Sequence, residues 1–124
     1  MSKKLQYLII HCTATPEGRH VSVADIEQWH LKERGWNRVG YSDMITLDGS
    51  LMNLHPFDTN DVVDPWEITN GVRGFNGLAR HIVYAGGTDR AGKTKDTRTA
   101  LQKATMIDYV RYMVKRHPDI QVAG

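Results

Sequence analysis

The chain has 124 residues, of which 40% are hydrophobic and 24% charged, a composition that fits one globular domain and leaves no room for two. Its net charge is only +2 and the charges of both signs are interspersed, so we expect no nucleic-acid partner. The single cysteine, Cys12, excludes an internal disulfide, and no apolar run reaches the ~18 residues of a membrane helix, so we expect no membrane partner either.

The N-terminal third predicts a strand followed by a helix. The short apolar run that begins at Leu5 lacks the length and cleavage site of a signal peptide, which predicts synthesis in the cytoplasm. Residues 5–11 are rich in β-branched and aromatic side chains and predict a buried strand. Residues 23–34 carry apolar side chains at helical spacing, and Ser22 with Asp25 three positions later forms an acceptable N-cap pattern.

The middle of the chain predicts a hairpin and a long loop. Two alternating segments, 41–47 and 50–54, flank the pair Asp48-Gly49, which tolerates the positive φ angles of a two-residue type I′ turn. Residues 55–78 have several Pro and Gly and no sustained period, so we expect an extended loop there. A loop of that length in a small domain is often functional.

The last third predicts a strand, a long helix and a final strand. Residues 81–85 form the strand, residues 99–117 form a helix ended by Pro118, and residues 120–124 begin another strand. One apolar stripe is expected to bury the helix, and it consists of Met106, Ile107, Val110, Met113 and Val114. This alternation of strands and helices predicts mixed α and β layers.

Chemistry is most plausible where the first strand ends. His11 stands at that end, and it can be a satisfied structural histidine, a metal ligand or a catalytic base. Because side chains alternate along a strand, His11 and Cys12 should point to opposite faces and not share one ion. Cys12 is more typical of a buried, inert thiol than of a nucleophile.

Five motifs in one order resemble the zinc-dependent N-acetylmuramoyl-L-alanine amidases, which are related to the peptidoglycan recognition proteins. They span nearly the whole chain and comprise His11-Cys12-Thr13-Ala14-Thr15, residues 26–30 with 34–36, Gly40-Tyr41 with the turn at 48–49, residues 74–76 with 84–87, and residues 92–99. The resemblance implies a single α/β domain with a central mixed β-sheet flanked by α-helices. It also implies cleavage of the amide between N-acetylmuramic acid and the L-alanine of the stem peptide, with peptidoglycan or a muropeptide as partner.

The same resemblance implies zinc as cofactor. Zinc acidifies a bound water and polarises a carbonyl when three protein ligands leave one position open. The resemblance makes His11 the first ligand and gives Tyr41 the role of positioning or protonating the reacting groups. The second histidine ligand, a lysine and the cysteine ligand of the family follow its last strand and match no residue here. We therefore expect residues 1–124 to be an amidase-like domain without the family's C-terminal segment, with weak or absent zinc.

Two explanations stay open: the chain is a truncated form of a longer amidase, or it is a complete protein that has lost the metal. Among the remaining histidines, His81 is the candidate surrogate ligand or base, because it replaces a glycine that is usual in the family. His30 is expected to pack with Trp29 and Trp36. His20, His55 and His117 are expected at the surface.

The resemblance also places Trp66, Arg73 and Asn76 in the wall of a substrate groove, where they could contact a glycan or a stem-peptide carboxylate. The absence of a signal peptide suits an endolysin, a phage or prophage lysis enzyme that reaches the cell wall after release by other means. One alternative is a peptidoglycan-binding module without catalysis. Another is a cysteine hydrolase that uses Cys12 with His81.

Overall fold

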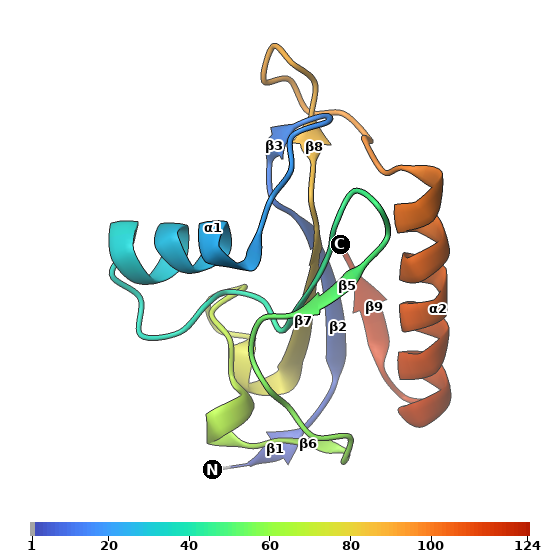
Figure 1. The fold of residues 1–124 in the computed structure, drawn as a ribbon. Coiled ribbons are helices and arrows are strands. Elements are labelled where there is room, and N and C mark those ends of the chain that lie inside the picture. The colour runs from blue at the N-terminus through green and yellow to red at the C-terminus, as the bar shows by residue number, and fades with distance from the viewer. Residues whose placement is uncertain (1) are drawn as a thin grey trace.

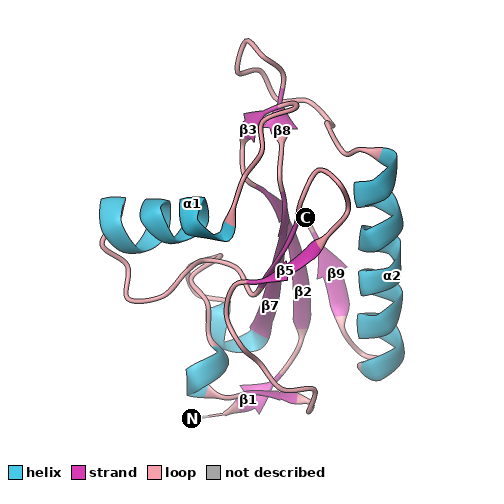
Figure 2. Ribbon diagram, viewed as in Figure 1, coloured by secondary structure: helices cyan, strands magenta, loops and turns pink. Residues whose placement is uncertain are grey.

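The computed structural model describes residues 2–124 and contains a five-stranded central sheet between two helical layers (Figures 1 and 2). The strand order is β5-β4-β7-β2-β9. Strands β4, β7, β2 and β9 run parallel, and β5 is antiparallel to β4. Their bounds are β2 Tyr7–Cys12, β4 Asp43–Ile45, β5 Leu51–Asn53, β7 Ala79–Tyr84 and β9 Gln121–Ala123. The predicted single α/β domain with a central mixed sheet is confirmed.

Two small ladders extend this sheet at its ends. Strand β1 (Lys3–Lys4) pairs with β6 (Val62–Val63), and β3 (Thr15–Pro16) pairs with β8 (Gly87–Thr88) beyond the ends of β2 and β7, at the top of Figure 1. Residues 55–78 are therefore not a structureless loop as expected. Besides β6 they contain two 3-10 helices, Pro65–Glu67 and Asn76–Leu78.

The two faces of the sheet have separate apolar cores. One lies against α2 (Ala100–Arg116) and includes Leu8 and Ile82, and the other lies on the α1 side and includes Val83 and Ile26. Since neighbours along a strand alternate between faces, His81 shares the α1 face with Val83. The pairing of Ile9 with His81 puts His11 two positions further along β2 on that same face.

The predicted helix over residues 23–34 is confirmed in its extent. It begins as α1 (Val23–Glu27) and continues as a π-helix over Gln28–Glu33. The Ser22 hydroxyl accepts the Asp25 N–H at 3.1 Å, and the Asp25 carboxylate accepts the Ser22 N–H at 2.9 Å. This reciprocal capping box fixes where the helix starts.

The hairpin forms, but its predicted two-residue type I′ turn is wrong. The Gly49 N–H donates to the Thr46 carbonyl, and the Thr46 N–H donates to the Ser50 carbonyl, which encloses three loop residues. Gly49 has φ +83°, whereas Asp48 is not in the positive-φ region that a type I′ turn requires. The Asp48 carboxylate instead accepts the Ser50 N–H at 3.0 Å, which favours the wider turn.

The long helix α2 matches the prediction to within a residue at each end, with Thr99 as N-cap and His117 as C-cap. Its buried stripe differs, because Ile107 and Val114 are 49% and 41% exposed. Gln102 and Tyr109 are buried instead, because they bond to the sheet. Gln102 donates to the carbonyls of residues 45 and 85, and the Tyr109 hydroxyl donates to the carboxylate of residue 43.

His117 is not at the surface as expected. Its side chain is buried, and its Nδ1 lies 2.9 Å from an Asp61 carboxylate oxygen. Among residues 2–124, no helix is both long enough and apolar enough to cross a membrane.

Candidate functional site

Parallel pairing of β2 with β7 brings two histidines together on the α1 face of the sheet. The Nε2 atom of His11 lies 2.9 Å from the Nδ1 atom of His81, and the two ring centroids are 5.0 Å apart. The Nε2 atom of His81 lies 2.9 Å from the Oδ1 atom of Asn76, at the start of the second 3-10 helix. The proposed first zinc ligand thus touches His81, the candidate surrogate for a missing ligand.

Burial makes both imidazoles poor bases. His81 is fully buried, and this desolvation, with smaller effects from His11 and Arg80, lowers its pKa from 6.5 to about 3. Burial also lowers the pKa of His11. Each ring is therefore neutral near pH 7 and carries one N–H and one lone pair.

A loop closes over His81 at Gly71. A Cβ atom built on Gly71 would lie 2.4 Å from two atoms of the imidazole ring, so any other side chain there would collide with it. The loop is tied down at the next residue, where the Val72 N–H donates to the Asn76 Oδ1 atom at 2.8 Å. His81 consequently has little room to turn.

Tyr41 lies beside this pair, as the sequence predicts. Its ring centroid is 5.1 Å from that of His11 and 5.3 Å from that of His30. Burial raises the pKa of Tyr41, so the phenol keeps its proton at neutral pH and can donate it to a hydrogen bond. His30 is structural, as expected: its Nδ1 accepts the Gly40 N–H at 2.9 Å and its ring packs 4.8 Å from that of Trp36.

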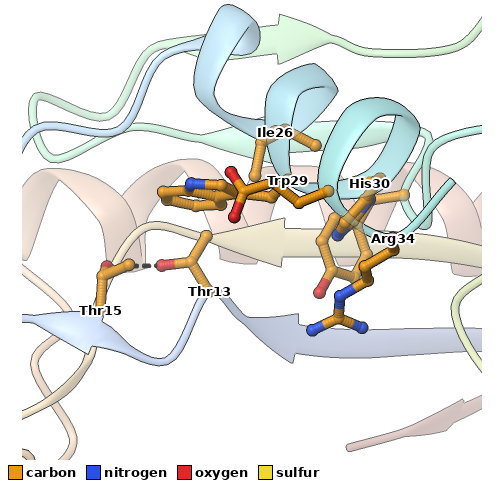
Figure 3. A pocket seen from close by; sticks show the side chains of 8 residues that line it. Thr13, Thr15, Ile26, Trp29, His30 and Arg34 are labelled. Carbon is orange, nitrogen blue, oxygen red and sulfur yellow. Dashed lines mark hydrogen bonds between the residues drawn. The ribbon is translucent and has the colours of Figure 1, made fainter.

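Next to Tyr41 a pocket of about 300 Å³ opens between the first helix and the end of β2 (Figure 3). Thr13 and Thr15 form one wall, with their hydroxyl oxygens 2.7 Å apart. The helix supplies the opposite wall, including both an acidic and a basic side chain. The lining residues are Thr13, Thr15, Ile26, Trp29, His30, Glu33, Arg34 and Tyr41.

All of these lining residues except Glu33 belong to the motifs found in the sequence, but the sequence did not indicate that they line one pocket. The threonines directly after the His11 strand were the available signal, because small polar residues at a strand end commonly border a site. Glu33 gave no comparable signal, since a charged residue near a helix end is usually solvated.

Cys12 does not join this group. Its Sγ atom fills the space beside Gly87, where a Cβ atom would lie only 2.4 Å away. Both nitrogens of His81 are already engaged, one by His11 and one by Asn76. The structure therefore does not form the Cys12–His81 pair that a cysteine hydrolase would need.

The three predicted substrate contacts lie in different settings. Trp66 is 46% exposed and Arg73 is exposed, so both side chains are accessible. Asn76 uses its Oδ1 atom inside the protein, for the bonds to Val72 and His81. A role in substrate binding stays a prediction for each of them.

Within residues 2–124, the only three potential metal ligands that converge are Asp58, Asp64 and Glu67. The Glu67 carboxylate already accepts the backbone N–H groups of Asp58 and Asp64, at 2.9 and 2.8 Å, and lies 3.5 Å from the Arg80 guanidinium. Glu67 and Arg80 are both buried, so this carboxylate is committed to the fold. At His11 the described residues offer a second imidazole and no third ligand, which is one short of a catalytic zinc site.

No protein-family model matches the chain. It is 27% identical over 121 residues to the endolysin of Klebsiella phage KP32, a match that spans 91% of this chain and 74% of that one. It is 33% identical over 86 residues to the endolysin of Escherichia phage T7, covering 69% of this chain and 51% of the relative. The chain thus spans between about half and three quarters of the length of these relatives.

Solved structures extend the likeness. The endolysin of the Thermus scotoductus phage Ph2119 superposes with a TM-score of 0.74 at 22% identity, over 98% of this chain and 71% of that one. The N-acetylmuramoyl-L-alanine amidase LysC of Clostridium intestinale gives 0.73 at 19% identity, over 97% and 69% of the two chains. Drosophila PGRP-LB gives 0.70 at 20% identity, over 100% and 73%. The chain has the amidase fold.

In this amidase fold, shared with the peptidoglycan recognition proteins, the pocket and the His11–Tyr41 pair lie on one face, at the end of the inner strand β2. The resemblance found in the motifs is thereby confirmed at the level of the fold.

Proposed function

We propose that this chain is a peptidoglycan hydrolase domain that acts on the amide between N-acetylmuramic acid and the L-alanine of the stem peptide. The observation that carries the proposal is the placement of His11 next to Tyr41, which lines an open pocket, in a chain similar to the endolysin of one phage over 91% of its length. A role as a phage or prophage lysis protein that acts on the cell wall follows from the same similarity.

Within the proposed site, Tyr41 is the proton-bearing group. Its raised pKa keeps the phenol protonated, so it can donate a hydrogen bond to the oxygen or nitrogen of the scissile amide. Arg34 at the pocket wall is suited to a stem-peptide carboxylate, and Arg73 and Trp66 are proposed as further contacts with peptide and glycan. Asn76 is proposed to use its amide N–H₂ group for substrate, because its oxygen is occupied.

Zinc is proposed as the cofactor, with His11 as a ligand. The residues described beside His11 do not make a three-ligand set, so we derive no step through the metal. We expect substoichiometric zinc and slow turnover from these 124 residues. Metal analysis of the purified chain checks the first expectation, and a full equivalent of bound zinc would contradict it.

The test of function is incubation of the chain with purified peptidoglycan and zinc, followed by mass spectrometry of released stem peptides. We expect release to be slow, to be sensitive to a chelator and to be lost in His11→Ala. His20→Ala is the matched control, because His20 is exposed and lies outside the pocket. Release that persists in His11→Ala would overturn the proposal.

A second candidate is a peptidoglycan-binding module without catalysis. It is favoured by one observation, that the pocket is formed while the described residues lack a third ligand at His11. A Drosophila PGRP-LB mutant of the same fold was solved in complex with tracheal cytotoxin. Co-sedimentation with peptidoglycan, reduced in Arg34→Ala and unaccompanied by peptide release, would assign this function. A chain that neither sediments nor releases peptide would contradict both candidates.

A further inference from the structure

Three side chains form a hydrogen-bonded row that ends at His11. Asn76 Oδ1 lies 2.9 Å from His81 Nε2, and His81 Nδ1 lies 2.9 Å from His11 Nε2. The row runs from a 3-10 helix across β7 to β2, and its middle member is fully buried. Its geometry determines where each proton sits.

The first link fixes the direction of the row. The same Asn76 Oδ1 atom accepts the Val72 backbone N–H at 2.8 Å. A backbone N–H can only donate, so the atom that it meets must be the amide oxygen and not the nitrogen. That oxygen can only accept, and His81 must therefore donate from Nε2.

The second link follows from the first. A buried, neutral imidazole has one N–H, and His81 uses it at Nε2, so its Nδ1 atom carries a lone pair. That lone pair faces His11 Nε2, which must supply the proton of the 2.9 Å bond. His11 is then the Nε2–H tautomer, and its lone pair is on Nδ1.

We propose that Asn76 and His81 are positioning residues that hold His11 in the Nε2–H tautomer, so that the lone pair of the His11 ring lies on Nδ1. This inference rests on the proposed function for its purpose, although the tautomer itself is a property of the free chain. A buried partner that fixes the proton of a histidine also orients its ring.

The packing around His81 supports this role. The close approach of Gly71 to the imidazole ring leaves little room for the ring to turn over and exchange its two nitrogens. Val72, the next residue, provides the N–H that orients Asn76. One loop thus holds both positioning residues in place.

The test is long-range ¹H–¹⁵N correlation spectroscopy of the ¹⁵N-histidine-labelled 124-residue chain at neutral pH, without metal or substrate. We expect one tautomer at both His11 and His81, with protonated Nε2 and unprotonated Nδ1. A protonated Nδ1 at His11, or a mixture of tautomers in the unaltered chain, would overturn the proposal. This measurement uses the unaltered chain, so it tests the proposal even if substituted chains fold poorly.

Two variants separate positioning from mere packing. Asn76→Ala removes the acceptor that orients His81, and we expect His11 to lose its single tautomer and become a mixture. Asn76→Asp keeps an oxygen acceptor for both donors and is expected to restore the single tautomer. An unchanged His11 spectrum in a folded Asn76→Ala chain would refute the relay. The tautomer measurement does not depend on turnover, so a chain that releases no peptide could still confirm the predicted tautomer. A chain that releases peptide but has a protonated Nδ1 at His11 would overturn this inference and leave the proposed function standing.

Discussion

Gly71 shows how strongly one residue can constrain the site. Its backbone lies so near His81 that a methyl group would overlap the ring, at 2.4 Å. We predict that Gly71→Ala displaces His81 or the loop and lowers the free energy of unfolding by about 1–3 kcal/mol, as overpacking does. Urea denaturation measures this loss. Gly77→Ala is the control, because a Cβ there meets nothing within 4 Å, and an equal loss in both variants would contradict the explanation.

The sequence named candidate site residues one at a time and did not indicate which of them touch. His11 and Tyr41 were two of these candidates, and they are neighbours in the structure. The bond between His11 and His81 was not anticipated, although alternation along two strands was enough to place each on a face. It depends on the register that pairs Ile9 with His81, and register between strands distant in sequence is set by the packed core as a whole.

At the scale of single elements, the start of α2 depends on Thr99. Its hydroxyl accepts the Gln102 N–H at 3.1 Å and donates to the Leu47 carbonyl at 2.8 Å, which links the helix to the hairpin. We predict that Thr99→Ala lowers the free energy of unfolding by about 1–2 kcal/mol, through the lost cap and the unpaired carbonyl. Thermal denaturation measures the change, and Thr99→Ser, which keeps the hydroxyl, should recover most of it. No recovery in the serine variant would show that the methyl group matters instead.

The sequence predicted those features of the helices that depend only on residues a few positions apart. The Ser22 and Thr99 caps act within a few residues, and the predicted starts of both helices lie within one residue of the observed starts. The buried stripe of α2 could not, because Gln102 and Tyr109 are drawn inward by polar groups on the sheet. The π-helical continuation of α1 could not be predicted either, because the spacing of the apolar residues is compatible with both an α-helix and a π-helix.

At the scale of the whole molecule, buried neutral histidines make stability depend on pH. His81 has a pKa of about 3 in the folded chain against 6.5 ordinarily, so below pH 6.5 the unfolded chain binds a proton that the folded chain does not. Stability should therefore fall as the pH drops from 6.5 toward 3, by up to about 1.4 kcal/mol per pH unit for this residue. The lowered pKa values of His11 and His30 add to the fall, and the raised pKa of Asp43 opposes it.

Urea denaturation at pH 7, 6 and 5 tests this expectation. His81→Gln removes the titrating ring, and its stability should fall less steeply than that of the unaltered chain. His20→Ala alters an exposed histidine and should leave the slope unchanged. If the free energy of unfolding falls equally steeply with pH in the unaltered chain and in His81→Gln, protonation of His81 is not the cause of the fall.

The layered architecture followed from the order of apolar patterns, whereas the order of strands in the sheet did not. Composition and alternation indicate that strands are buried by helices, and this holds for α1 and α2 on opposite faces. They do not indicate that β2 lies between β7 and β9, because both are far from it in sequence. The pairing of β2 with β7 is what brings His11 next to His81.

The position of β2 also bears on how the chain folds. Its partners are β7 on one side and β9 on the other, where Tyr7 pairs with Gln121. The first long strand to leave the ribosome thus finds its neighbours only after most of the chain has been synthesised. Long-range parallel pairing of this kind slows folding, because loop closure comes before any contact that stabilises it. An apolar strand without its pairing partners can associate with other chains. The nascent protein should therefore be most prone to aggregation before α2 and β9 have been synthesised.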